Sequence, residues 1–300
     1  MNNTDEKLWL FNEVEVGQDG IITEVRLTRE NIAEYALVSQ SEDAHSLAGT
    51  SVMPTMILSY APLMRETIAN KHGYTALEQS TTARRQTPFT KCEIRWFSEV
   101  SEGDTLTATR EVVQKYSRRG SNFVTFRVSA YNQNSDKVGE YYYTCIFDYS
   151  NQKKLRSSPK TSHRDHTIAQ HLTSLEFHET QDSMNRKDAF KLIGERGIGS
   201  NIHTDEKFAK NSIFGGTVNS GPATMAYVDQ TLGSYFSAPA FYDGGRLLMR
   251  AITPFRSGDT VRFDASGSQE NEKFNCQVVG RNQKMELVCL AEATLQNCLK

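Results

Sequence analysis

The sequence lacks several features that would assign it to a specialised class of protein. No apolar run approaches the roughly 20 residues needed to cross a bilayer, and residues 1–20 lack the basic start and apolar stretch of a secretory signal. The net charge of −2 gives no basic excess of the kind that nucleic-acid-binding proteins carry. The five cysteines are scattered and form no CxxC pair, which argues against disulfides or a zinc site: Cys92, Cys145, Cys276, Cys289 and Cys298. We therefore expect a cytoplasmic protein with neither a metal nor a membrane or nucleic-acid partner.

The chain instead contains a loose internal repeat. Residues 97–106, "FSEVSEGDTL", and 252–261, "ITPFRSGDTV", each place a Gly-Asp-Thr turn between apolar stretches. A strand–turn–strand pattern follows in both halves, with an Asn-Gln pair at each bend, at 132–133 and 282–283. The 300 residues suit two domains of common size or one domain duplicated, and the matching order favours a duplication.

A helical pattern precedes each set of strands. Residues 54–70, "PTMILSYAPLMRETIAN", and 221–236, "GPATMAYVDQTLGSYF", carry apolar residues three and four positions apart. Each segment starts at or just after a proline, Pro54 or Pro222, which suits the first turn of a helix. One long helix followed by several antiparallel strands, present twice, predicts an α+β unit whose sheet wraps its helix.

Residues 150–172 separate the two repeats. This stretch is basic, rich in serine and poor in large apolar residues, so we interpret it as an exposed linker between an N-terminal unit, 1–149, and a C-terminal unit, 173–300. It also contains three histidines, His163, His166 and His171. No cysteine or set of carboxylates accompanies them to complete a metal site.

Residues 200–228, "SNIHTDEKFAKNSIFGGTVNSGPATMAYV", resemble a segment of the MaoC-like hydratase/dehydratase family. The shared features are a polar loop ending in histidine, an acidic helix start and a glycine leading into a central helix. Residues 91–140 are similar to the N-terminal unit of double-hotdog members of that family. The resemblance implies two hotdog units, each a long helix held in a curved antiparallel sheet. It also implies reversible hydration of a trans-2-enoyl thioester of CoA or acyl carrier protein, to an (R)-3-hydroxyacyl thioester, without a cofactor.

The catalytic motif departs from the family pattern Gly-Asp-x-Asn-Pro-(Leu/Ile/Val)-His. Counted back from His203 without gaps, Ile198 replaces the catalytic aspartate, and an aliphatic residue cannot carry protons. A second alignment starts from the aromatic residue that precedes the motif, here Phe190, and places Glu195 at the aspartate position with a two-residue insertion. We prefer it because it keeps a carboxylate beside the histidine.

The resemblance and the chemistry together assign roles to these residues. Glu195 would be the acid–base carboxylate and His203 its partner, which orients the attacking water. Ser200 or Asn201 would hold that water or the loop. These assignments predict that Glu195 and His203 face one pocket.

The oxyanion of the intermediate would accept a hydrogen bond from the Gly221 backbone N–H, at the start of the central helix. Unpaired amides and the helix dipole both favour negative charge there, and glycine allows close approach of the thioester oxygen. Ser220 stands where many family members have histidine.

Each of these residues also has a simpler interpretation. A histidine followed by Thr-Asp-Glu is typical of a helix start, in which Thr204 or Asp205 is the N-cap. Glu195 would then be a solvated charge beside Arg196. Two other functions therefore stay open: a hotdog thioesterase, and a non-catalytic subunit that binds acyl thioesters.

The first half offers Asp43 and His45 at the position that corresponds to the His203 loop. Its connection from His45 to Pro54 is shorter than the one from His203 to Pro222. We therefore expect an N-terminal unit without catalysis that accommodates the acyl chain. Residues 84–86 and 118–122 contain paired arginines suited to a CoA phosphate. Both hotdog units of a pair lie within this one chain, so they form a pseudo-dimer. The sequence therefore leaves two oligomeric states open, a monomer and a homodimer.

Overall fold

The computed structural model describes residues 6–149, 169–193 and 201–300. Its strands form one antiparallel sheet of ten strands, in the order β1-β3-β4-β5-β2-β7-β10-β9-β8-β6. The strands are β1 (Thr23–Arg26), β2 (Phe89–Trp96), β3 (Thr105–Arg118), β4 (Ser121–Tyr131), β5 (Lys137–Tyr149), β6 (Gln170–His178), β7 (Arg246–Ala251), β8 (Thr260–Glu270), β9 (Lys273–Asn282) and β10 (Leu287–Gln296).

The strand order reads the same from both edges. The first half runs β1-β3-β4-β5-β2 inward, and the second half runs β6-β8-β9-β10-β7 inward. The halves join where β2 pairs with β7, with Ile94 opposite Leu247 in the register. The duplicated α+β architecture predicted from the repeat is therefore confirmed. Because β6 begins at Gln170, the end of the predicted linker 150–172 belongs to a strand, and residues 150–168 lie outside the described residues.

The repeated Gly-Asp-Thr turn has the same hydrogen bonds in both halves. In the first half the side-chain amide of Gln133 donates to Asp104 at 3.0 Å, and in the second Gln283 donates to Asp259, also at 3.0 Å. The glycine that precedes each aspartate has a left-handed backbone, with φ of +92° and +87°, which glycine adopts without a steric penalty. The sequence repeat thus encodes a repeated local structure.

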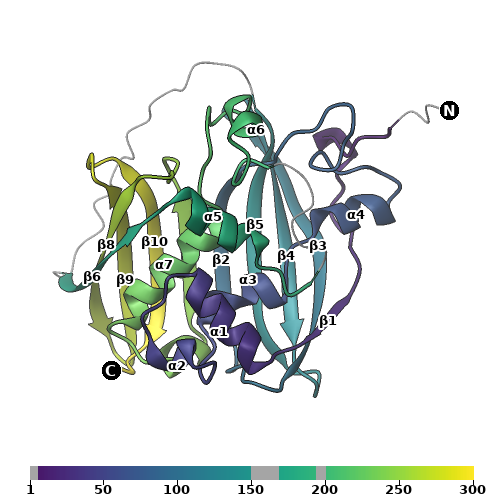
Figure 1. Cartoon of the computed structure of the whole chain (residues 1–300). Helices are drawn as coiled ribbons and strands as arrows, with labels where there is room; N and C mark the ends of the chain where they lie inside the picture. The colour runs from purple at the N-terminus through teal and green to yellow at the C-terminus, as the bar shows by residue number, and fades with distance from the viewer. Residues whose placement is uncertain (1–5, 150–168, 194–200) are drawn as a thin grey trace.

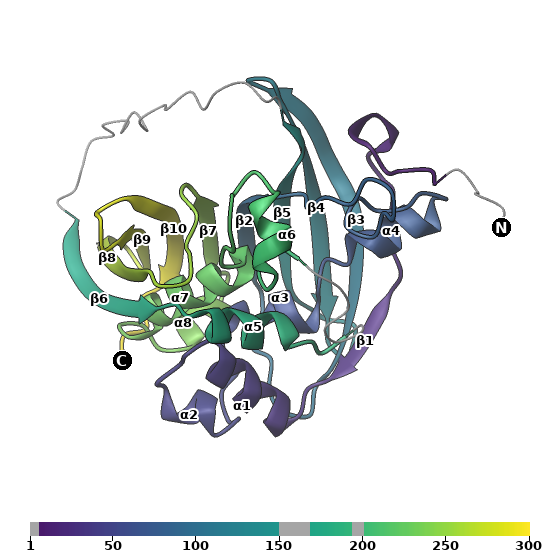
Figure 2. The same ribbon diagram turned by 45° about the horizontal axis from the view of Figure 1, so that its top comes forward.

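The helices lie on the concave side of the curved sheet (Figure 1). Each edge strand is followed by a helix, α1 after β1 and α5 after β6, and Figure 2 shows the two strands at opposite ends of the sheet. The helices and 3₁₀ segments are η1 (Phe11–Glu13), α1 (Arg29–Val38), α2 (Ala44–Leu47), η2 (Pro54–Met56), α3 (Ile57–Tyr60), α4 (Arg65–Lys71), α5 (Gln181–Ala189), α6 (Glu206–Lys210), α7 (Gly221–Gly233) and α8 (Pro239–Tyr242).

The central helix predicted over 221–236 is confirmed as α7. Its apolar side chains enter the main core, which also receives residues from β2, β7, β8 and β10. Ser220 is its N-cap and accepts a hydrogen bond from the Ala223 N–H at 3.3 Å. Pro222 lies in the first turn, where its missing N–H has no intrahelical partner to lose.

The continuous helix predicted over 54–70 is wrong. The segment forms η2 and α3, breaks at residues 61–64, and resumes as α4. Pro62 explains the break, because a proline inside a helix removes a donor and disfavours the helical conformation of the preceding residue. Met64 then turns the chain with a φ of +47°. Met56 and Ile68 are nevertheless both fully buried, so the apolar spacing reflects burial without a continuous helix.

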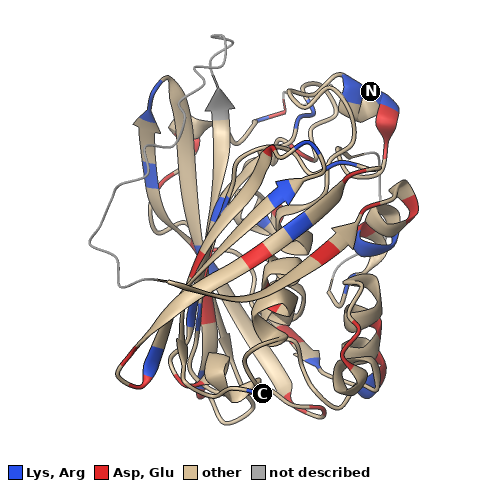
Figure 3. Ribbon diagram, turned by 90° about the vertical axis from the view of Figure 1, so that its left-hand side faces the viewer, with Lys and Arg blue, Asp and Glu red and all other residues tan. Residues whose placement is uncertain are grey.

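Acidic and basic residues are interspersed along the ribbon of the strands seen in Figure 3. No face of one sign is visible in that view, in line with the small net charge. None of the helices in the described part of the chain combines the length and the apolar composition that crossing a membrane requires.

Candidate active site

His203 lies at a cavity of about 270 Å³ between the two halves, which we call the His203 cavity. The second half contributes the end of α5, the loop around His203 and the first turn of α7. The first half contributes its broken helical segment, the start of β2 and one residue of β5, including Leu58, Phe89 and Tyr143. The cavity therefore exists only because the two halves pack together.

The imidazole of His203 is held in one tautomer. Its Nδ1 is 2.8 Å from the carbonyl oxygen of Val218, and a carbonyl only accepts, so Nδ1 carries the hydrogen in the neutral ring. The other ring nitrogen, Nε2, is then an unprotonated acceptor. Burial lowers the pKa of His203, although the Val218 carbonyl and the charge of Asp188 oppose that effect. The side chain is a neutral base at neutral pH.

Asp188, at the end of α5, is a carboxylate hydrogen-bonded to this loop. Its Oδ2 accepts a hydrogen bond from the side-chain amide of Asn201 at 2.8 Å. Asn201 in turn accepts from the His203 N–H at 2.7 Å and from the Thr204 N–H at 3.1 Å. Asn201 therefore links Asp188 to the His203 loop, consistent with its predicted role in holding the loop.

Two of the predicted site residues, Glu195 and Ser200, lie outside the described residues. The simpler interpretation holds for Asp205, whose Oδ1 accepts from the Phe208 N–H at 2.9 Å as the N-cap of α6. His203 lies in a turn two residues before that N-cap, as the simpler interpretation expects, and it also lines the cavity. Sequence reasoning missed Asp188, which no motif marks.

Gly221 and Ser220 line the same cavity at the start of α7. The Gly221 N–H makes no hydrogen bond to any residue that the structure describes. A methyl group on Gly221 would lie 2.5 Å from Cγ of Phe89, so the ring of Phe89 requires glycine at this position. From the sequence we expect glycine here because it allows a thioester oxygen to approach the backbone closely, and the structure adds the ring of Phe89 as a steric reason.

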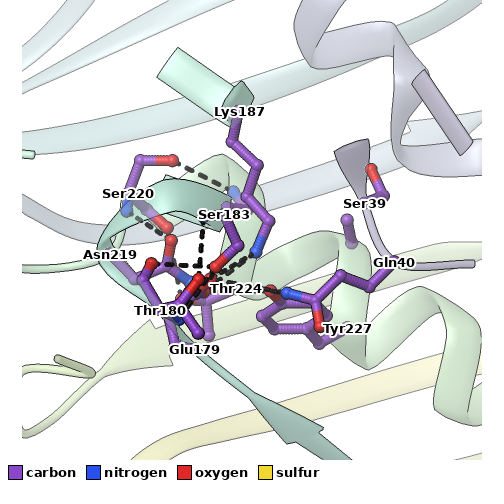
Figure 4. Close-up of polar contacts among 12 residues, drawn as sticks. Ser39, Gln40, Glu179, Thr180, Ser183, Lys187, Asn219, Ser220, Thr224 and Tyr227 are labelled. Atoms are coloured by element: carbon purple, nitrogen blue, oxygen red, sulfur yellow. Dashed lines mark hydrogen bonds and ion pairs between the residues drawn. The ribbon is translucent and has the colours of Figure 1, made fainter. Parts of the chain in front are cut away.

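A buried polar network fixes α5, and with it Asp188, to the rest of the fold (Figure 4). Glu179 has no exposed surface and accepts hydrogen bonds from Lys187 at 2.9 and 3.1 Å, from Tyr227 at 2.9 Å and from Ser183. Gln40, from the first half, donates to Tyr227 at 2.8 Å. Burial lowers the pKa of Lys187 to about 8 against the attraction of Glu179. The network joins α5, α7 and the segment after α1.

The corresponding loop of the first half has a different structure. Asp43 is the N-cap of α2 and accepts from the Ser46 N–H at 2.8 Å, and His45 is exposed within that helix. Among the residues that the structure describes, no group of three or more His, Cys, Asp or Glu side chains is arranged to hold a metal ion.

No protein-family model and no curated protein matches this sequence. Solved structures match it closely in fold. A MaoC-like dehydratase is 13% identical, with a TM-score of 0.66 over 95% of this chain and 99% of that one. A conserved protein of Mycobacterium tuberculosis with a double hotdog fold is 14% identical, with a TM-score of 0.55 over 96% and 98%.

A protein from Lactobacillus plantarum described as an oleoyl thioesterase is also similar to this chain. It is 10% identical, with a TM-score of 0.54 over 95% of this chain and 100% of that one. The double hotdog fold predicted from the family resemblance is confirmed. Identities this low establish the fold alone, and the same fold serves more than one chemistry.

Proposed function

We propose that the His203 cavity catalyses the reversible hydration of a trans-2-enoyl thioester to a 3-hydroxyacyl thioester. One observation carries the proposal: a neutral histidine lines one cavity with the first amide of α7. Its Nδ1 is committed to Val218, and its Nε2 makes no hydrogen bond to any residue that the structure describes. A general base and an oxyanion site are two of the groups that this reaction needs.

In the hydration direction, His203 Nε2 accepts a proton from water while the water oxygen forms a bond to C3. The electron pair of the double bond moves toward the thioester, and its oxygen becomes enolate-like. That oxygen accepts a hydrogen bond from the Gly221 N–H, where the dipole of α7 also favours negative charge. A neighbouring carboxylic acid then delivers a proton to C2, and the imidazolium returns its proton to the resulting carboxylate.

Two carboxylates are candidates for that second proton carrier. Glu195 is the choice from the family alignment, and Asp188 is the one held to the His203 loop through Asn201. If Asp188 only fixes the loop, an amide at that position supports the histidine equally well. If it carries a proton, the amide abolishes turnover.

The first-half wall of the cavity supports an acyl substrate. Leu58 and Pro62 come from the broken segment, and Phe89 and Tyr143 from the adjoining strands. An unbroken helix over 54–70 would follow a different path through this region. A volume of about 270 Å³ suits a short acyl chain, so crotonyl-CoA is the first substrate to test.

The CoA moiety is the proposed partner of the arginines at 84–86. Gln86 lines the cavity, and the guanidinium of Arg84 lies 5.2 Å from the ring centroid of Phe208. Arg85 is exposed beside them. Arg85→Ala should raise KM for crotonyl-CoA but not for crotonyl-pantetheine, which lacks the nucleotide phosphates. An equal effect on both substrates would rule out a phosphate contact.

The decisive variants are His203→Ala, Asp188→Asn and Glu195→Gln, with loss of enoyl thioester absorbance as the assay. We expect His203→Ala to lower kcat/KM by on the order of 10²-fold or more. Exactly one carboxylate variant should lower kcat comparably, which would identify the second proton carrier. His178→Ala is the matched control, because His178 is exposed and outside the cavity. Full activity of His203→Ala would refute the assignment.

The alternative function is thioester hydrolysis. It is favoured by the similarity in fold to a protein described as an oleoyl thioesterase. The same histidine would then direct water at the carbonyl carbon and release free CoA. Detection of thiol during the same incubation separates the two reactions.

A further inference from the structure

A second cavity among the described residues is larger than the His203 cavity. It encloses about 630 Å³. The first half contributes the loop after α1 and the start of η2, and the second half contributes β6 and the later turns of α7. The two halves thus exchange the parts that they have in the His203 cavity, where the loop and the helix start come from the second half. We call the second cavity the Asp229 cavity. It shares none of the residues proposed above for catalysis.

Asp229 is a buried carboxylate in the middle of α7 that lines this cavity, with 3% of its surface exposed. Its Oδ2 accepts two hydrogen bonds from Thr55 of η2, from the backbone N–H at 2.9 Å and from Oγ1 at 2.6 Å. Its Oδ1 accepts none from any residue that the structure describes. Among the described side chains, the fully buried polar atom without a hydrogen-bond partner is Ser98 Oγ, so Asp229 Oδ1 retains accessible surface. A molecule in the cavity can therefore donate a hydrogen bond to this oxygen.

The rest of the lining defines the kind of molecule that fits. Apolar side chains form much of the wall, among them Val52, Met53, Phe177, Phe236 and Phe241. Glu42 and Glu176 add two carboxylates at exposed positions, and the cationic Lys300 lies 3.8 Å from a third, Asp43. Negative charge is therefore in excess, which disfavours an anion such as a CoA thioester.

We propose that the Asp229 cavity binds an amphipathic amine, whose apolar body packs against the aromatic wall and whose ammonium group donates a hydrogen bond to Asp229 Oδ1. Burial raises the pKa of Asp229 to about 6, so the carboxylate is ionised at neutral pH. A charge-assisted hydrogen bond is stronger than one between neutral groups, which favours an ammonium over a hydroxyl. The proposal does not depend on the reaction at the His203 cavity.

Three probes with the same chain and different head groups test it: octylamine, octanol and octanoate. Binding to the whole protein is measured by titration calorimetry. Tryptophan fluorescence gives a second readout, because the Trp96 ring packs against Phe241 at 5.6 Å between centroids. We expect octylamine to bind at least tenfold more tightly than octanol, and octanoate to bind most weakly.

Asp229→Asn is the matched variant. Its amide oxygen can still accept both hydrogen bonds from Thr55, which turns the amide nitrogen toward the cavity in place of Oδ1. We expect the affinity for octylamine to fall by about tenfold or more and that for octanol to change little. Glu176→Gln, at an exposed cavity residue, should change octylamine binding by much less.

Equal affinities for octylamine and octanol in the wild type would overturn the proposal, because the cavity would then recognise only apolar bulk. Tighter binding of octanoate, or unchanged octylamine affinity in a folded Asp229→Asn protein, would overturn it as well. Absence of binding by all three probes would show that the cavity takes no such ligand.

Discussion

The ion pair of Glu179 and Lys187 offers a stability prediction whose magnitude follows from burial. Their side chains are 0% and 7% exposed. Removing either partner leaves the other charge buried without compensation, which typically costs about 3–5 kcal/mol. We therefore expect Glu179→Leu and Lys187→Met each to lower the free energy of unfolding by about that amount.

The double variant should cost much less than the two single variants together. With both charges removed, Ser183 still donates to the Thr180 carbonyl at 2.9 Å and Gln40 still donates to Tyr227. The Tyr227 hydroxyl loses its acceptor, at about 1–3 kcal/mol, and Gln40 loses its longer contact to Glu179, at 3.4 Å. The predicted coupling between the two substitutions is therefore several kcal/mol.

Urea unfolding measures these differences, with the fluorescence of the buried Trp9 and Trp96 as the signal. The exposed pair of Arg250 and Glu292, 3.0 Å apart, is the control, and its cycle should give a coupling below about 1 kcal/mol. If the losses at Glu179 and Lys187 simply add, the pair does not act as a buried ion pair and the reasoning fails.

Three further predictions concern the two cavities. The folded-state pKa of Asp229, about 6, exceeds the unfolded value of about 3.9, so its contribution to stability is lost as pH rises from 4 to 7. The free energy of unfolding of the wild type, measured in urea, should therefore fall relative to that of Asp229→Asn by about 2 kcal/mol over that range. Gly221→Ala should lower both Tm and turnover through the collision with Phe89, and a second change, Phe89→Leu, should restore part of the Tm; an unchanged Tm would contradict the contact. Because burial holds the pKa of His203 below its usual value, kcat/KM for hydration should rise with pH through a midpoint below about 6.5, whereas a midpoint above 7 would show that another group titrates.

The sequence predicted the parts of the fold that short stretches encode. The turns at Asp104 and Asp259 depend on hydrogen bonds to side chains of the adjacent hairpin, so their motif repeats visibly. The helix α7 follows from its apolar spacing and N-terminal proline. The same apolar spacing across 54–70 led to the wrong prediction of a continuous helix. A broken segment whose apolar residues are buried can show that spacing too. Pro62 was the local signal of the break.

The site was predictable only where the family resemblance reached it. The family motif singled out His203, which the structure places at the cavity. Asp188 contacts the same loop through a residue thirteen positions further along the chain. Glu179 gains its partners from α5, α7 and the first half, over separations of up to 139 residues. Phe89, which excludes any side chain at Gly221, comes from the other hotdog unit. Such contacts depend on the tertiary fold, and no local pattern reveals them.

The central claim is that the His203 cavity adds water across the double bond of an enoyl thioester. Incubation of the purified protein with crotonyl-CoA, followed by mass analysis of the products, tests it most directly. We predict 3-hydroxybutyryl-CoA with its thioester intact, formed by the wild type and by His178→Ala but not by His203→Ala. Release of free CoA without hydrated thioester, or equal hydration by His203→Ala, would contradict the claim.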